Sequence, residues 1–360
     1  MRGTMSGIQE SGQTGPRRGR AWLLGGGALI LLLAVVLVVG VVGLAGRGGD
    51  GNPTSRTAPS TAAPTPPPFP AAPYAVSDEA LLTVPEETRI AQGTFWAEAG
   101  AEYVVTMDLR STMPEGSGGR SMYLGVTLSC SPRAGGPGIS VGGTQNMLTG
   151  EETTYRNQGL ISMPEDGGVD CSIKLSAPYD DVASRDTTFP AGASWEVRRA
   201  DAAAQAPTDT VLPTTIAAGA TEDVLTAELP IDEAGEGLEA LSSLHLTACT
   251  GVNGSREDGR AWCREDALDE GGSTVTLRAR MELVGEDGNA CAELAAQALP
   301  ADRIELHRHH RLLSLALETS LPERPCGRQA RVTLAVHNDG PAPVVVHRTN
   351  SSLLLTTPAG

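Results

Sequence analysis

Two patterns of apolar and polar residues divide the chain. Residues 22–46, WLLGGGALILLLAVVLVVGVVGLAG, form an apolar run without a charged side chain. From Tyr74 onward, short segments alternate apolar and polar positions between turns rich in glycine, proline and aspartate. The first pattern is typical of a membrane-spanning helix, because about 20 apolar residues cross a bilayer core. The second is typical of β-strands that bury one face.

The alternating segments predict a mainly-β fold with two tandem, immunoglobulin-like β-sandwich domains, at residues 74–200 and 208–358. The clearest strands are expected at residues 103–109, 122–128, 173–175, 195–197, 244–246, 274–283, 332–336 and 352–355. Residues 290–297, ACAELAAQ, are the exception and are compatible with a helix. The break between the domains is expected in DAAAQAPTD, residues 201–209.

The two halves resemble degenerate copies of one another. The motif EAGAEY at residues 98–103 matches EAGEGL at residues 233–238. MPE precedes Cys171 as LPE precedes Cys326, and an alternating strand follows each cysteine. The second copy is longer before its last two cysteines, which predicts an inserted loop at residues 250–270. The alternative is that a bias toward alanine and glycine imitates such short matches.

All six cysteines follow the apolar run. An even number of cysteines in an exported region indicates disulfides, and six cysteines allow 15 pairings. The repeat reduces these to Cys130–Cys171, Cys249–Cys263 and Cys291–Cys326. A metal site is the alternative, but the sequence has no CxxC motif, and no cysteine pair stands beside a histidine pair.

The charges around the apolar run predict its orientation. Arg17, Arg18 and Arg20 precede it, so residues 1–20 are expected to be a cytoplasmic tail and residues 21–46 a single transmembrane helix. Residues 47–73 are rich in proline and threonine and predict a disordered linker. The domains are then extracytoplasmic, on the cell membrane. A cleaved signal peptide is the alternative, although its apolar region is usually about 7–15 residues long.

Charge excludes one class of partner. The chain has a formal net charge of −16, and the part after residue 73 holds 41 acidic and 21 basic side chains. Such a surface repels nucleic acid. Arginine almost replaces lysine, and alanine and glycine are abundant, which indicates a GC-rich genome such as that of an actinobacterium.

Motifs of catalysis are missing from the sequence. It has no HExxH or Walker loop, so no catalytic residue and no cofactor are predicted. A serine, histidine and aspartate assembled only in space would still make an envelope hydrolase, and that alternative stays open.

Metal sites are weakly indicated. If residues 303–313 form one strand, His307 and His309 share a face, with Glu305 as a third ligand and His310 adjacent. The neighbouring arginines disfavour a cation, so a solvated strand face is the preferred interpretation. The acidic turns, such as residues 164–170 and 285–289, suit Ca²⁺ chemically but are ordinary turn sequences. We expect no metal.

The inserted loop is the predicted partner-binding site. It holds Trp262 and three arginines, residue types that commonly anchor protein interfaces; the arginines are Arg256, Arg260 and Arg264. Packing of the tryptophan on its own disulfide is the alternative. The sequence therefore predicts a non-enzymatic, membrane-anchored binding protein of the bacterial envelope, with an unknown protein or an envelope glycan as partner. A structural accessory subunit of a membrane complex is a further alternative.

Overall fold

The computed structural model describes most of the chain after residue 73. The described residues are 74–75, 80–83, 88–116, 121–176, 186–189, 194–231, 237–248, 252–253, 262–263, 272–305 and 309–358. Within these ranges no helix is long and apolar enough for a bilayer span. The predicted tail (1–20), transmembrane helix (21–46) and linker (47–73) lie outside them. The described part is mainly β, as predicted, and its helical segment is the four-residue α2 (Thr208–Val211).

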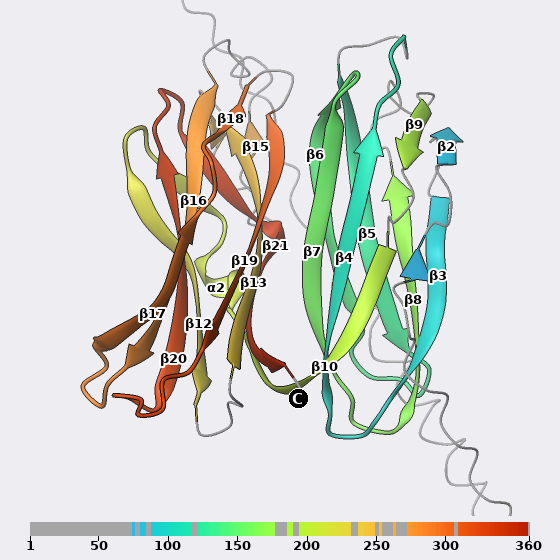
Figure 1. Ribbon diagram of the computed structural model, residues 1–360. Helices are drawn as coiled ribbons and strands as arrows, with labels where there is room; N and C mark the ends of the chain where they lie inside the picture. The colour runs from blue at the N-terminus through green and yellow to red at the C-terminus, as the bar shows by residue number, and fades with distance from the viewer. Residues whose placement is uncertain are drawn as a thin grey trace, which may run out of the picture. The chain divides into compact units, whose positions relative to one another are not determined.

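The first half of the described chain forms a β-sandwich (Figure 1). One sheet has the order β3 (Thr88–Ala97), β8 (Gly167–Ser176), β5 (Ser121–Pro132) and β6 (Ile139–Leu148). The other layer pairs β7 (Glu152–Ser162), β4 (Glu102–Thr112) and β10 (Ser194–Gln205), with β1 (Tyr74–Ala75), β2 (Ala80–Thr83) and β9 (Asp186–Phe189) beside them. The core between the layers holds the largest buried side chains, among them Trp195, Tyr103, Tyr155, Phe95 and Phe189.

The second half forms another sandwich with its own core. One sheet has the order β12 (Thr221–Pro230), β20 (Gln329–Asn338), β16 (Ser273–Val284) and β17 (Ala290–Ala298), and β18 (Asp302–Ile304) pairs with β16. The other layer pairs β19 (His310–Ser320), β13 (Gly237–Ala248) and β21 (Val344–Pro358), with β11 (Thr214–Ile216) on β21. Its core is almost entirely aliphatic.

The two sandwiches share one strand order, as a duplicated unit requires. Within the sheets, the order β3-β8-β5-β6 corresponds to β12-β20-β16-β17, and the order β7-β4-β10 corresponds to β19-β13-β21. Corresponding strands also follow one another in the same order along the chain. Eight residues separate β4 from β5, whereas 24 separate β13 from β16. The insertion expected at residues 250–270 therefore lies in this connection. Its described part is a short hairpin of β14 (Val252–Asn253) and β15 (Trp262–Cys263).

Backbone pairing joins the sandwiches. The end of β10 pairs with the end of β21, from Ala200 with Pro358 to Gln205 with Leu354, so that one ten-stranded sheet contains strands of both halves. The break expected at residues 201–209 thus begins inside a strand that both sandwiches use. The limits of two independently folding domains, 74–200 and 208–358, stay a prediction.

Alternation along the strands separates core residues from residues at the junction of the sandwiches. In β4, Val105 and Met107 enter the first core, whereas Val104 faces the other way and packs with Leu241 and Leu354. Strand β13 is buried along almost its whole length, because one face lies on the second core and the other on the junction. The junction is therefore an internal surface of the described structure.

Two expectations about single elements are wrong. Residues 290–297 form strand β17, not a helix, because the turn at Gly285–Asn289 returns the chain along β16 and the ladder with β16 outweighs the helix propensity of alanine. Residues 303–313 do not form one strand. β18 pairs with β16 and β19 pairs with β13, so the two segments belong to different sheets.

Two of the three predicted disulfides are confirmed. Cys130–Cys171 links neighbouring strands β5 and β8, with Cα atoms 4.1 Å apart. Cys291–Cys326 links β17 to the segment before β20, with Cα atoms 6.1 Å apart. The bridges therefore occupy different places in the two copies, although the repeat suggested equivalent ones. The third prediction, Cys249–Cys263, falls on Cys249, which lies outside the described residues.

The two disulfides should differ in their contribution to stability. Their loops span 41 and 35 residues, so loop-closure entropy predicts about 4 kcal/mol for each. Cys130 and Cys171 are also packed in the first core, whereas Cys291 and Cys326 are exposed. The variant C130A/C171A should therefore lose more free energy of unfolding than C291A/C326A, by about 1–3 kcal/mol. Urea denaturation followed by circular dichroism measures both, and equal losses would contradict this expectation.

Candidate functional site

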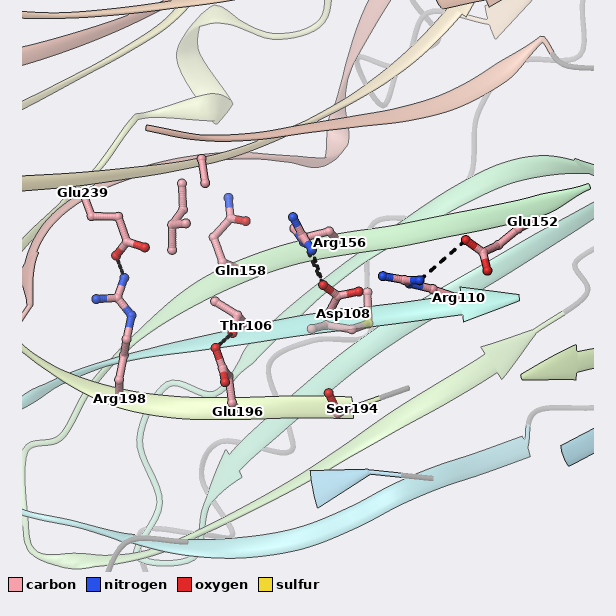
Figure 2. Close-up of a pocket in the computed structure, with 13 residues that line it drawn as sticks. Thr106, Asp108, Arg110, Glu152, Arg156, Gln158, Ser194, Glu196, Arg198 and Glu239 are labelled. Atoms are coloured by element: carbon pink, nitrogen blue, oxygen red, sulfur yellow. Dashed lines mark hydrogen bonds and ion pairs between the residues drawn. The ribbon is translucent and has the colours of Figure 1, made fainter. Parts of the chain in front are cut away.

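A polar groove of about 580 Å³ opens at the junction of the two sandwiches (Figure 2). Strands β4, β7 and β10 contribute one wall, and β13 and β19 contribute the other. Its lining residues are Thr106, Met107, Asp108, Arg110, Glu152, Arg156, Gln158, Ser194, Glu196, Arg198, Glu239, Leu241 and Ala316. This set contains four carboxylates, three guanidinium groups and no aromatic ring.

Strand alternation places these polar groups in the groove. In β4, Thr106, Asp108 and Arg110 are separated by the core residues Met107 and Leu109, so the three polar side chains share the outer face. Their cross-strand neighbours have the same orientation. Arg156 of β7 is directly opposite Asp108, and Glu196 of β10 is directly opposite Thr106. Each of these pairs is also joined through its side chains.

Ion pairs cross the groove from a covered end to an open one. Arg198 and Glu239 link the two sandwiches, and their side chains are only 28% and 15% exposed (Figure 2). Arg110 and Glu152 lie at the other end, with 60% and 53% exposure and a distance of 3.9 Å between Nη1 and Oε1. Surface pairs of the second kind contribute little to stability, whereas a covered pair depends strongly on both partners.

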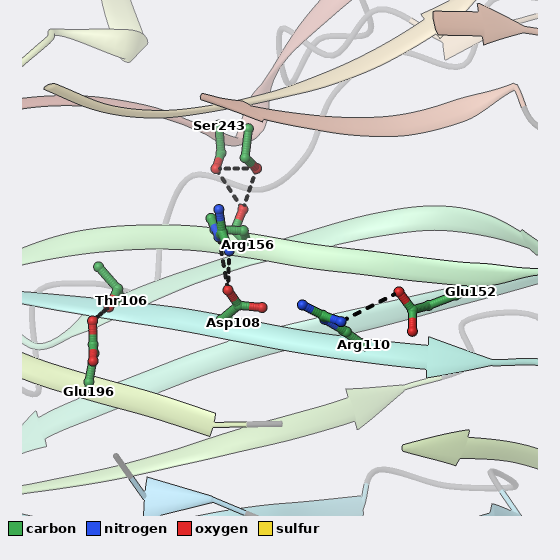
Figure 3. Close-up of polar contacts among 8 residues, drawn as sticks. Thr106, Asp108, Arg110, Glu152, Arg156, Glu196 and Ser243 are labelled. Carbon is green, nitrogen blue, oxygen red and sulfur yellow. Dashed lines mark hydrogen bonds and ion pairs between the residues drawn. The ribbon is translucent and has the colours of Figure 1, made fainter. Parts of the chain in front are cut away.

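Arg156 is held at the middle of the groove. Its Nε donates to Asp108 Oδ2 at 3.0 Å. Its backbone carbonyl accepts hydrogen bonds from the hydroxyls of Ser243, at 2.6 Å, and Ser314, at 2.8 Å (Figure 3). Ser243 and Ser314 belong to β13 and β19, so the second sandwich fixes the backbone that positions a groove residue of the first.

Charge within the groove is nearly balanced. Burial lowers the pKa of the Arg198 guanidinium, and the carboxylates of Glu196 and Glu318 act in the opposite direction. Thr106 donates to Glu196 at 3.3 Å, which leaves the other carboxylate oxygen accessible to an additional donor. The groove thus presents donors and acceptors close together.

Side-chain amides form hydrogen bonds between the two sandwiches, at the groove and beyond it. Gln158 Nε2 donates to Ser352 Oγ at 2.9 Å, and that hydroxyl donates to Asn157 Oδ1 at 2.7 Å. Gln145 Oε1 accepts the backbone N–H of Leu312 at 3.2 Å. Gly143 of β6 lies so close to Leu312 that a Cβ at this glycine would lie 2.3 Å from its side chain. The two sandwiches therefore contact each other through matched hydrogen bonds rather than through a large apolar patch.

The histidines assemble differently from the sequence expectation. His307 lies outside the described residues. His310 packs against His245 and His347, two histidines that the sequence did not single out, with ring centroids 5.2 and 6.4 Å away. Within the described ranges no three His, Cys, Asp or Glu side chains are arranged to hold a metal ion.

The predicted partner-binding loop is described only in part. The backbone of Trp262 pairs with Asn253 in the β14–β15 hairpin. Arg256, Arg260 and Arg264 lie outside the described residues, and the side chain of Trp262 is not described. The role of this loop stays a prediction.

One arrangement resembles an acid–base relay. His337 Nδ1 lies 2.8 Å from Thr221 Oγ1, and its Nε2 lies 2.7 Å from Asp339 Oδ1. Thr221 and His337 are cross-strand partners in β12 and β20, and the Asp339 side chain is 59% exposed. Such an open site does not exclude water, and electrostatic catalysis is weak there.

Comparisons with known proteins give distant likenesses. No family model matches the chain, and no curated protein matches it. Among solved structures, a tandem pair of carbohydrate-binding modules, CBM22-1-CBM22-2, from Paenibacillus barcinonensis Xyn10C is 12% identical, covers 74% of this chain and 83% of its own, and has a TM-score of 0.24. The infectious bursal disease virus Gt strain structure is 10% identical, with 80% and 76% coverage and a TM-score of 0.28. A Paenibacillus xanthan lyase is 10% identical, with 82% and 27% coverage and a TM-score of 0.22. At these TM-scores the likenesses carry no argument about this chain.

Removal of Arg198 should destabilise the junction. In R198M, Glu239 keeps its covered position without its partner, so we expect a loss of about 2 kcal/mol in the free energy of unfolding. The variant R198M/E239L should recover part of this loss, because no charge then remains unpaired. R110M, in the exposed pair, should change stability by less than about 0.5 kcal/mol. Chemical denaturation of the four proteins tests the ranking, and an equal effect of R110M and R198M would refute it.

Proposed function

We propose that this protein is a non-enzymatic binding module of the bacterial cell envelope and that the groove between β4, β7, β10, β13 and β19 is its ligand site. One observation carries the proposal. The groove places four carboxylates and three guanidinium groups around a space of about 580 Å³, within the range of small-ligand sites. Structural pairing alone does not require such a hollow.

The groove suits a polyhydroxylated ligand such as an envelope glycan. A sugar hydroxyl donates and accepts at the same time, so it is able to bond to Asp108 and Arg156 without leaving either charge unpaired. The apolar atoms of Leu241 and Ala316 offer contact for the C–H groups of a sugar ring. The exposed Arg110–Glu152 end gives a longer chain a way out of the groove.

Two alternatives have less support. The hydrolase alternative finds its best arrangement at Thr221, His337 and Asp339, but this relay lies on exposed strand ends. A structural accessory subunit would explain the hydrogen-bonded junction but not the hollow beside it. A protein partner at the inserted loop remains compatible with a glycan in the groove.

Binding should depend on the groove carboxylates. We expect an array of neutral and acidic bacterial oligosaccharides to capture the full chain. For the strongest ligand, isothermal titration calorimetry should show at least a tenfold weaker affinity for D108N and E196Q.

The matched control is D170N. Asp170 of β8 forms a surface ion pair with Arg133, which follows β5. Arg133 Nη2 lies 2.7 Å from Asp170 Oδ1, and the pair lies outside the groove. D170N should bind as the wild type does. If D108N and E196Q are captured as strongly as the wild type, the ligand site lies elsewhere on the protein. If no glycan captures the protein, the proposed ligand class is wrong.

We further propose that residues 21–46 anchor the protein in the cell membrane as a single span, with residues 1–20 in the cytoplasm. The supporting observations are the length of the apolar run and the arginines before it. N-terminal mapping by mass spectrometry of the membrane fraction should then recover peptides from residues 1–20. A mature N-terminus near Gly46 would show that a signal peptide is cleaved instead.

A further inference from the structure

Three adjacent strands bring one buried and two half-buried histidines together where the second sandwich meets the first. His245 of β13, His310 of β19 and His347 of β21 lie together, and the His245 ring stacks on His347 at 4.6 Å between centroids. The first sandwich contacts this histidine cluster at His310. Tyr123 of β5 lies 4.6 Å from the His310 ring, and Asn146 of β6 accepts the His310 backbone N–H at 2.8 Å.

The hydrogen bond between His245 and His310 requires that one of the two facing ring nitrogens carries no proton. His245 Nδ1 lies 3.3 Å from the carbonyl of Thr349, which only accepts, so Nδ1 carries the proton. In a neutral imidazole Nε2 is then the acceptor, and it accepts a hydrogen bond from the Nδ1–H of a neutral His310 at 3.0 Å. Protonation of both rings would place two donors face to face and break this hydrogen bond.

Among the residues that the structure describes, the charged groups near the cluster do not offer it a carboxylate. Arg311, beside His310, donates to Asp302 at 2.6 Å, and Arg348, beside His347, pairs with Asp209. His309 packs against His310, with 4.4 Å between the ring centroids. The phenols facing the cluster from the first sandwich are Tyr123 and, behind it, the buried Tyr155, whose pKa burial raises.

Burial is the main cause of a lowered pKa at all three rings. It lowers the pKa of His245 to about 3 and that of His347 to about 4, and it lowers the pKa of His310 well below its usual value. Neighbouring histidines lower the pKa of His245 and His310 further. The packed state therefore binds fewer protons than a state with hydrated rings. Its stability is complete above about pH 6.5 and falls as the pH decreases toward 4 and then 3.

The cluster belongs to the junction and not to either core. His245 lies on the face of β13 opposite Leu244 and Leu246, which enter the second core. Separation of the two sandwich faces would hydrate the rings and leave both cores intact. The other polar contacts between the faces include short side chains such as Ser352 and Asn157, which water is able to replace, and the Arg198–Glu239 ion pair.

We propose that the histidine cluster makes the packing of the two sandwiches pH-dependent, so that the junction is closed at neutral pH and opens on mild acidification while the disulfide-linked cores persist. The inference is independent of the proposed ligand. It also predicts that the groove, which shares β13 and β19 with the cluster, is lost in acid.

Hydrogen–deuterium exchange of the full chain tests the proposal, in one mild detergent and with EDTA present. Protection factors, corrected for the intrinsic pH dependence of exchange, are compared at pH 7.5 and 5.0. In the wild type, junction peptides covering residues 200–205 and 310–312, whose backbone N–H groups bond across the junction, should lose at least tenfold protection, because each hydrated ring shifts the equilibrium by up to about tenfold per pH unit. Core peptides of β5 and β16 should change less than threefold.

Matched variants decide the cause. H245Q/H347Q keeps neutral donors and acceptors but removes two titrating rings, so its junction should lose less than threefold protection. H347Q alone should show an intermediate loss, which supplies the answer if the double variant does not fold. H337Q removes a histidine of β20 outside the cluster and should behave as the wild type. A wild-type junction that stays protected at pH 5.0, or variants of the cluster that open as the wild type does, would overturn the proposal.

Discussion

The pairing of β10 with β21 is the constraint on which the described structure depends. Residues 200–205 and 354–358 form a ladder with one irregularity between Ala200 and Ala202, and this ladder fixes the position of the two sandwiches relative to each other. Because the ladder uses only the ends of the two strands, the rest of the junction is closed by side chains. Most of those side chains are polar, although Val104, Leu241 and Leu354 form a small apolar cluster among them. The groove and the histidine cluster both follow from this arrangement.

Much of the fold was predictable from alternation. Residues such as Tyr103, Val105 and Met107 show a period of two, and the strand they predict is β4. The cysteines were predictable for a similar reason, because short motifs repeated around them suggested pairs before any contact was known. The repeat itself is visible in the strand order of the two halves. Its cysteines are not equivalent, because Cys130 lies on β5 whereas Cys291 lies on β17, one strand further along.

The candidate site was not predictable in the same way. Alternation marks Thr106, Asp108 and Arg110 as an outward face, but an outward face normally meets water. Only the pairing of β10 with β21 turns this face into one wall of a groove. His245 and His347 likewise stand 102 positions apart in the sequence and meet through the β13–β21 register. Strand β17 shows the reverse case, in which local alanine content indicated a helix and the β16 ladder decided the outcome.

Strand β21 also has a consequence for how the chain matures. It pairs with β13 and β11 in the second sandwich and with β10 in the first, and it is synthesised after all three. During translation the first sandwich therefore emerges with the end of β10 unpaired, and the second core lacks the strand that carries Leu353 and Leu355. Strand β21 therefore completes both the second core and the junction of the two sandwiches. For an exported chain this couples the final assembly to the transport of β21.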